Sequence, residues 1–314
     1  MRVTTSSDTA AQDTRPLVTQ ACRAAGLDPT GAEPVRIADN AIWSLPGRIV
    51  IRITRPGRRP AARRELLTAQ WLAEHHLPAV RPAHPTAVDL PGNRAATFWE
   101  QLPEHTVGRH EDVARLLCRL HQLPAPAHLP TLADPATKAR SRLETLPHHC
   151  VISEADMGWL LGYAEELADA WRSLDDGLAP TPLHGDAWAG NVARTPDGQC
   201  YLLDLDSAAV GPPEWDLTST AVKVDTTATI PLHEYARFVT AYGGHDVRDY
   251  AGFPVMRGIR ELRMTTYAIQ TATDHPHTAV EARHRVACLR GRNGPRPWRW
   301  TAVPHPPGSP GPIV

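Results

Sequence analysis

The segment 181–217 limits the possible folds of this chain more than any other part, because it contains the pattern of a β-hairpin. It reads TPLHGDAWAGNVARTPDGQCYLLDLDSAAVGPPEWDL. Short apolar runs at 192–194 and 200–203 flank Pro196-Asp197-Gly198, a group of residues typical of a tight turn. The segment therefore predicts two antiparallel strands joined at residues 196–198.

Three polar residues occupy the open end of this predicted hairpin. Asn191 precedes the first strand, Asp204 follows the second, and Asp186 lies in a Gly-containing loop just ahead of them. Because a hairpin brings its two ends together, Asn191 and Asp204 are expected side by side. Carboxylate and amide oxygens are hard ligands suited to Mg²⁺, which would neutralise phosphate charge. Asp186 would then be left to orient a hydroxyl group and accept its proton.

The same segment resembles a known family. The run His-Gly-Asp-x-x-x-x-Asn at 184–191, thirteen residues before Asp204, resembles the catalytic loop and metal-binding Asp of aminoglycoside phosphotransferases and their choline-kinase-like relatives. The family pattern Gly-x-x-x-Trp-Asp-Leu is matched at 211–217. The resemblance covers roughly residues 35–290 and is most specific in this central segment. It implies an α+β, bilobal protein-kinase-like fold, with a small antiparallel-sheet N-lobe and a larger, mainly helical C-lobe.

The resemblance also implies roles for individual residues. Asp186 would be the catalytic base, Asn191 and Asp204 the Mg²⁺ ligands, and His184 and Asp216 structural supports of the loop. The phosphate donor would be ATP or GTP, and the acceptor a hydroxyl of a small molecule. The alternative is a polar hairpin without chemistry. Three spaced motifs in register argue against that alternative more strongly than His-Gly-Asp alone would.

The N-terminal half departs from the family at one position. Kinase-like lobes place a basic residue on a strand, paired to a Glu of the next helix, so that it contacts the α- and β-phosphates. The family usually has Lys there, but the only lysines are Lys138 and Lys223. Arg52, on a predicted strand, and Glu65, on a predicted helix, occupy the matching places. Arg is longer and planar, which would change the geometry of phosphate binding. An ordinary surface ion pair is the alternative.

Two further nucleotide contacts are expected in this half. No clear Gly-rich loop is present, and residues 38–42 are the expected substitute for the loop that covers the phosphates. Residues 98–102 resemble the hinge strand, whose backbone groups would meet the adenine edge. Within that strand, Glu100 and Leu102 are the residues predicted to make these contacts.

Composition changes near residues 101–104, where β-like patterns give way to helical ones. We therefore predict a tail at 1–13, a nucleotide-binding lobe at 14–102, a catalytic and substrate lobe at 103–300 and a tail at 301–314. A ligand is expected between the two lobes. Helical patterns occur at 15–26, 61–76, 111–122, 153–177, 213–224, 231–242, 252–273 and 277–290, and strand patterns at 35–45, 48–54, 85–89 and 95–100, with an irregular loop at 124–135.

Bulk properties exclude several other classes. A net charge of −1 and a pI near 7.0 give no field for attracting nucleic acid or an anionic membrane. Five scattered cysteines without a Cys-x-x-Cys pair disfavour a zinc ribbon or disulfide framework. No signal peptide or membrane span is evident, so we predict a cytoplasmic protein. No Walker A, dinucleotide, zincin or hydrolase motif is present.

Two functional hypotheses remain from the sequence. The first is an active kinase for a small hydroxylated metabolite or antibiotic, and the second is a degenerate regulatory module that binds nucleotide or ligand without turnover. A protein acceptor is disfavoured, because the chain runs almost directly from Asp206 to Trp215 and leaves no room for a long activation segment. The acceptor stays open among sugars, nucleosides, peptide antibiotics and amino alcohols. Polycationic aminoglycosides need acidic sites, and the final helices offer only scattered acids: Glu234, Asp246, Asp249 and Glu261.

Overall fold

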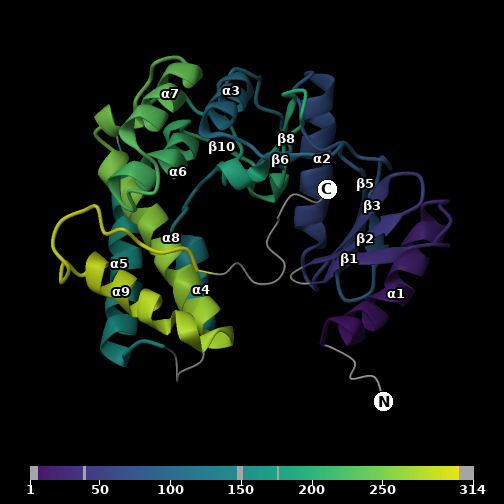
Figure 1. Ribbon diagram of the computed structural model, residues 1–314, viewed down its shortest axis with the longest axis horizontal. Coiled ribbons are helices and arrows are strands. Elements are labelled where there is room, and N and C mark those ends of the chain that lie inside the picture. The colour runs from purple at the N-terminus through teal and green to yellow at the C-terminus, as the bar shows by residue number, and fades with distance from the viewer. Residues whose placement is uncertain (1–5, 38–39, 147–150, 175–176, 304–314) are drawn as a thin grey trace.

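The computed structural model describes residues 6–37, 40–146, 151–174 and 177–303. A small antiparallel sheet comes first in the chain, and a mainly helical region follows it, as the sequence predicts. Figure 1 shows the sheet between helices α1 (Ser6–Ala24) and α2 (Arg59–Glu74), with the helical region beside α2.

The main sheet has five strands in the order β1-β2-β3-β5-β4, and all neighbouring pairs are antiparallel. Alternate residues of the central strand β3 point to opposite faces. Ile51 packs with the side chains of α1, whereas Val50 packs with those of α2. Arg52 lies two residues after Val50 and therefore on the same face of the strand, toward α2. The strands are β1 (Glu33–Ile37), β2 (Asn40–Leu45), β3 (Ile49–Thr54), β4 (Val88–Leu90) and β5 (Arg94–Glu100).

Two predictions for the N-terminal half differ from the structure. Helix α1 begins at Ser6 and not near residue 15, so part of the segment predicted as a tail is helical. The polar residues before Pro16 are compatible with a helix but carry no apolar periodicity, which is why the pattern missed them. The strand predicted at 35–45 is in fact two paired strands, β1 and β2.

The helical region contains the predicted helices and one that the sequence did not indicate. The additional helix, α4, has only Ala139 and Leu143 buried, so its apolar pattern is too sparse to be recognised. Ser153 caps α5 as predicted, its side chain accepting a hydrogen bond from the amide of Asp156. The helices are α3 (His110–Leu120), α4 (Thr137–Thr145), α5 (Glu154–Arg172), α6 (Glu214–Asp225), α7 (Leu232–Tyr242), α8 (Phe253–Asp274) and α9 (Ala279–Leu289). Short 3₁₀ turns lie at Ala189–Asn191, Leu205–Ser207, Val247–Asp249 and Pro276–Thr278.

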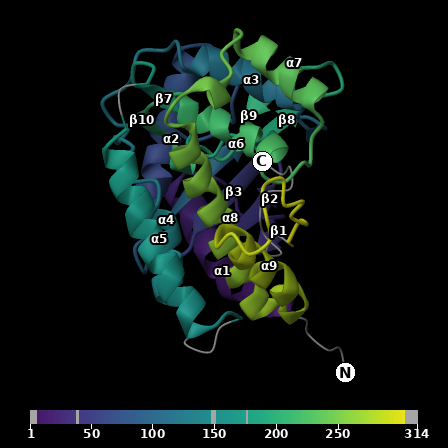
Figure 2. The same ribbon diagram turned by 90° about the vertical axis from the view of Figure 1, so that its left-hand side faces the viewer.

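Helix α8 is central to this region. It packs against α4, α5, α6 and α9, and Figure 2 shows it between α5 and α9. Its residues Met256, Ile259, Leu262 and Ile269 are fully buried. Burial of such side chains contributes about 1.5–3 kcal/mol each, before the cost of ordering the chain. Among the described residues no helix combines the length and apolar character needed to cross a bilayer.

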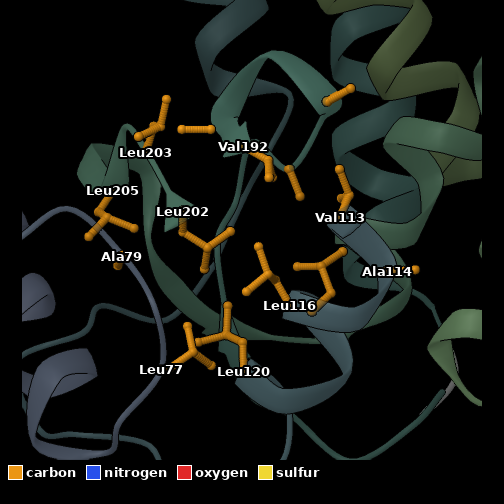
Figure 3. Close-up of a cluster of buried hydrophobic side chains, with 14 of the residues drawn as sticks. Leu77, Ala79, Val113, Ala114, Leu116, Leu120, Val192, Leu202, Leu203 and Leu205 are labelled. Carbon is orange, nitrogen blue, oxygen red and sulfur yellow. The ribbon is translucent and has the colours of Figure 1, made fainter. Parts of the chain in front are cut away.

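The predicted hairpin is present between the two halves of the molecule. Strand β8 (Val192–Arg194) pairs with β9 (Cys200–Leu202) on one side and with β6 (Thr106–Val107) on the other. Strand β7 (Thr181–Leu183) pairs with β10 (Ala209–Gly211). The hairpin turn contains Gly198 at φ +87°. Figure 3 shows Val192, Leu202 and Leu203 in one buried cluster with Leu77, which follows α2, and with Leu116 of α3. This shared core fixes the open end of the hairpin relative to both halves.

Candidate active site

The loop that carries Asp186 is held by a buried carboxylate on α6. Asp216 has no solvent exposure, and its two oxygens accept hydrogen bonds from the amides of His184 (2.7 Å) and Gly185 (2.9 Å). The neighbouring Trp215 donates its indole N–H to the carbonyl of Gly185 (3.1 Å). The backbone before Asp186 is therefore fixed on both its donor and acceptor sides.

His184 joins this loop to the end of the hairpin. Its Nε2 lies 2.8 Å from the carbonyl oxygen of Leu203, and its Nδ1 lies 3.4 Å from the amide nitrogen of Asp186. A carbonyl only accepts and an amide only donates, so Nε2 carries the proton and Nδ1 is the acceptor. The side chain is buried. The structure thus gives His184 and Asp216 the supporting positions that the sequence predicts.

Gly185 is required where the loop passes close to residue 207. Its φ is +80°, and a Cβ placed on it would lie 2.0 Å from the carbonyl oxygen of Ser207. Any side chain would both strain the backbone and push these two segments apart.

Gly185→Ala should therefore destabilise the protein by about 4 kcal/mol and displace Asp186. Gly47→Ala is the matched control, because Gly47 also has positive φ (+83°) but nothing within 4 Å of the added Cβ. That variant should lose only about 1–2 kcal/mol. Urea unfolding of both variants measures the difference, and equal losses would show that the close approach at Ser207 carries no energy.

Two arginines of α8 contact the carboxylate of Asp186. Arg260 Nη1 lies 3.3 Å and Arg263 Nη2 3.7 Å from Oδ1, while the Asp186 side chain keeps 37% of its exposure. Burial alone would raise the pKa of Asp186, but Arg263, Lys138 and Arg260 outweigh that effect and bring it to about 2. The group is therefore ionised throughout the neutral range. The sequence analysis assigned no role to either arginine.

Asn191 and Asp204 lie together at the open end of the hairpin. Asn191 donates from Nδ2 to the carbonyl of Asp186 (2.9 Å), and its own carbonyl accepts from the amide of Leu203 (2.9 Å), next to Asp204. The side-chain Oδ1 of Asn191 is buried and accepts no hydrogen bond from the described residues. An oxygen in that state is available to a ligand, because leaving it permanently unpaired would cost about 1–3 kcal/mol.

Asp204 has an unusual backbone for a residue with a side chain. Its φ and ψ are 53° and 64°, in the left-handed region, which costs about 1–2 kcal/mol. Burial raises the pKa of its carboxyl, and the nearby carboxylate of Asp206 raises it further. Arg52 Nη2 lies 3.6 Å from Asp204 Oδ1, and Arg58 lies 3.3 Å from Asp206. Strain and crowded negative charge at one point are typical of a functional site.

These residues fit a divalent cation. They supply an unpaired amide oxygen on Asn191 and a carboxylate on Asp204 in an excess of negative charge. Within the parts of the chain that the structure describes, no three His, Cys, Asp or Glu side chains gather into a complete metal site. Two protein ligands are enough for Mg²⁺, which commonly takes its remaining ligands from substrate phosphates and water.

Arg52 and Glu65 form the ion pair that the sequence predicts. Arg52 Nη1 lies 2.5 Å from Glu65 Oε1, and the side chains are only 16% and 4% exposed. Burial alone would lower the pKa of Arg52, but Glu65, Asp204 and Asp206 together raise it above its usual value. The pair is therefore buried and faces Asp204, unlike an ordinary surface ion pair.

The predicted hinge lies at the end of β5. The amide of Glu100 donates to the carbonyl of Arg81 (2.8 Å), and that of Gln101 donates to the carbonyl of Arg48 (2.8 Å). The amide of Leu102 forms no hydrogen bond with any described residue. Of these three donors it is the one available to a nucleotide base. The expected phosphate-covering loop falls partly on residues 38–39, which lie outside the described residues, and its remainder is in β2.

Comparison with known families agrees with this geometry. The family model described as "Phosphotransferase enzyme family" matches residues 35–259. The chain belongs to this family. The resemblance predicted from the motifs at 184–191 and 211–217 is therefore confirmed, and family membership assigns the protein to phosphate-transferring enzymes. No curated protein matches the chain in sequence.

Solved structures of similar fold include several small-molecule kinases. An aminoglycoside phosphotransferase from Streptomyces rimosus is 19% identical with a TM-score of 0.57, over 80% of this chain and 98% of its own. An amicoumacin kinase in complex with AMP-PNP, Ca²⁺ and Ami is 15% identical with a TM-score of 0.63, over 88% and 95%. Choline kinase from Streptococcus pneumoniae is 12% identical with a TM-score of 0.60, over 88% and 98%. These likenesses confirm the bilobal kinase-like fold.

Proposed function

We propose that this phosphotransferase moves the γ-phosphate of ATP or GTP to a hydroxyl group of a small molecule, such as an antibiotic or a metabolite. The observation that carries the proposal is the convergence of Asp186, Asn191 and Asp204 beside the buried Arg52–Glu65 pair. Phosphoryl transfer needs a group that orients the acceptor, a ligand for the metal and a cation that contacts the phosphates. The partly exposed carboxylate of Asp186, the unpaired Oδ1 of Asn191 and the buried guanidinium of Arg52 fit these three roles.

The reaction follows from these positions. The acceptor oxygen attacks the γ-phosphorus, the bond from that phosphorus to the bridging oxygen breaks, and the nucleoside diphosphate leaves. The hydroxyl proton passes to the carboxylate of Asp186, which a pKa of about 2 keeps ionised but makes a weak base. A weak base is sufficient, because the transition state is loose and the proton leaves late.

The nucleotide would be held by groups from both halves. Arg52, fixed by Glu65, would contact the α- and β-phosphates, and the backbone carbonyl of Glu100 and the amide of Leu102 would meet the base. Asn191 and Asp204 would hold Mg²⁺, which neutralises phosphate charge when bound. The AMP-PNP and Ca²⁺ in the amicoumacin kinase complex support a nucleotide and a divalent cation as cofactors here.

The alternative is a regulatory module that binds nucleotide without turnover. It is favoured by one observation, the Arg at position 52 where the family usually has Lys. A screen of nucleotide consumption by the purified protein against hydroxylated antibiotics and metabolites tests the proposal directly. Phosphorylation of an acceptor supports the kinase, whereas nucleotide binding without transfer to any acceptor supports the module.

Variants of Arg52 separate the two functions. Arg52→Ala should raise the nucleotide KM at least about tenfold and lower kcat, because a charge-assisted contact to phosphate contributes about 1.5–3 kcal/mol. Arg52→Lys should keep measurable activity, since a point charge still reaches phosphate. Glu65→Gln should have a smaller effect than Arg52→Ala, because it removes only the positioning partner.

Steady-state kinetics and isothermal titration with nucleotide measure these effects. Arg63→Ala is the control, since it removes the same charge from an exposed ion pair with Asp89 on the same half of the molecule. Wild-type nucleotide binding in all three site variants would place Arg52 outside the nucleotide site.

A further inference from the structure

Basic side chains from two helices surround Asp186 on the side of the helical region. Arg260 and Arg263 of α8 contact its carboxylate at 3.3 and 3.7 Å. Lys138, in the first turn of α4, lies close enough to Asp186 and Arg263 for the charges to influence one another. None of these cations belongs to the groups assigned above to the nucleotide or the metal.

The packing of α4 on α8 fixes this arrangement. Arg142 lies one turn after Lys138, on the same face of α4. Its Nη1 donates to the carbonyl of Arg263 and to the hydroxyl of Thr266, both at 3.3 Å. Its guanidinium also lies over the ring of Tyr267, 5.5 Å from the centroid. Figure 2 shows the two helices next to each other.

Three cations, Arg260, Arg263 and Lys138, lie around the carboxylate of Asp186, and the carboxylates of Asp206 and Asp216 act on them from further away. Arg260 and Arg263 share the single carboxylate of Asp186 in their ion pairs. Burial lowers the pKa of Arg260 to about 9, and Arg263 contributes to the lowering. The side chain of Lys138 is exposed, but the protein around its ammonium, Arg263 and Arg142 together lower its pKa more than the carboxylates of Asp186 and Asp206 raise it.

Lys138 is the member of this group that is free to bind. Its side chain is exposed, and it forms no hydrogen bond or ion pair with any residue that the structure describes. An exposed, unneutralised ammonium beside a catalytic carboxylate attracts anions and repels cations.

Three of the four scattered acids that could attract a cationic acceptor are engaged by other side chains of the protein. Glu261 is fully buried and accepts from Arg296 through both oxygens, each at 2.6 Å. Asp246 pairs with Arg248 at 2.7 Å, and Glu234 lies 2.6 Å from His110. Asp246 and Glu261 are therefore neutralised by arginines within the protein, and Glu234 is engaged by His110. Asp249, the fourth of these scattered acids, is exposed.

We infer that the acceptor carries an anionic group, a carboxylate or a phosphate ester, near its reactive hydroxyl, and that Lys138 and Arg263 bind this group. The inference rests on the proposed function and narrows it to one class of acceptor. Both side chains can donate to an anion, and together with Arg260 they offset the charge of Asp186, which would otherwise repel such a substrate.

The experiment begins with an acceptor screen sorted by charge. The purified full chain, with Mg²⁺ and ATP or GTP, is given cationic acceptors (aminoglycosides and amino alcohols), neutral ones (sugars and nucleosides) and anionic ones (hydroxycarboxylates and sugar phosphates). We expect the highest kcat/KM among the anionic compounds. The two anionic sets distinguish carboxylate from phosphate recognition. For a carboxylate, its methyl ester should react with a kcat/KM at least about tenfold lower.

Charge reversal at Lys138 then tests the assigned residue with the best acceptor. Lys138→Glu should lower kcat/KM for that acceptor at least about tenfold, mainly through KM of the acceptor and not of the nucleotide, and Lys138→Gln should have an intermediate effect. Arg140→Glu is the matched control on the same helix, because Arg140 pairs with Asp134 and Glu165. It should stay within about twofold of wild type. Thermal melting confirms that all three variants are folded.

The outcomes separate this inference from the proposed function. A best acceptor that is cationic or neutral, or a Lys138→Glu variant with unchanged or higher kcat/KM, overturns the anionic-acceptor inference while phosphoryl transfer stands. Nucleotide binding without transfer to any of the three classes overturns the proposed function and the inference with it.

Discussion

Asp186→Asn should reduce phosphoryl transfer by about 10²–10⁴-fold while leaving the fold and nucleotide affinity intact. The reacting hydroxyl loses its proton acceptor, but the loop keeps its shape, because Asp216 and His184 hold it through backbone groups. The groups proposed to bind nucleotide lie on other segments. Single-turnover rates measured beside nucleotide titration would show the two effects separately.

Asp197→Asn is the control for this change. Asp197 lies in the turn at the opposite end of the same hairpin, so the substitution removes an equal charge away from Asp186. Its activity should match wild type. Near-normal turnover of Asp186→Asn itself would remove Asp186 from the mechanism.

Asp204→Ala should abolish Mg²⁺-dependent activity, a loss of at least about 10³-fold, corresponding to about 4 kcal/mol of transition-state stabilisation. The change removes the anionic ligand assigned to the metal and a partner of Arg52. Asp204→Asn should also be strongly impaired, since it keeps the shape and removes only the charge. Steady-state rates measure the loss of activity. Isothermal titration of nucleotide into the protein, in the presence and in the absence of Mg²⁺, measures the change in binding.

The metal dependence gives this prediction its internal control. Nucleotide titrated without Mg²⁺ should bind Asp204→Ala at least as well as wild type, because a negative charge near the phosphates has been removed. Unchanged Mg²⁺–nucleotide binding together with an unchanged rate would show that the open end of the hairpin is not the metal site.

The sequence predicted those features that depend on short-range patterns. The hairpin followed from Pro196-Asp197-Gly198 between two apolar runs, and the placement of Asn191 near Asp204 followed from the hairpin. The Arg52–Glu65 pair followed from the family resemblance, because kinase-like lobes pair a basic residue on a strand with a Glu of the next helix. Each of these relations spans few residues, so local geometry and turn chemistry determine it.

The basic group around Asp186 could not be predicted in the same way. Arg260 and Arg263 are more than seventy residues away from Asp186 in the sequence, and their helix was predicted without any signal that distinguished them from other arginines. Lys138 lies on α4, whose sparse apolar pattern hid the helix itself. Only the packing of α4 on α8 brings these charges to one place.

The Arg52–Glu65 ion pair, already formed in this structure, indicates how the activity of the protein can be controlled. In protein kinases such a pair often forms only after a switch segment is phosphorylated. Here the pair is already formed in the chain alone, and residues 207–213 are all that separate Asp206 from the start of α6. The protein therefore lacks a segment there that could hold it inactive. We therefore expect the Arg52–Glu65 pair to form on folding, without phosphorylation of the chain.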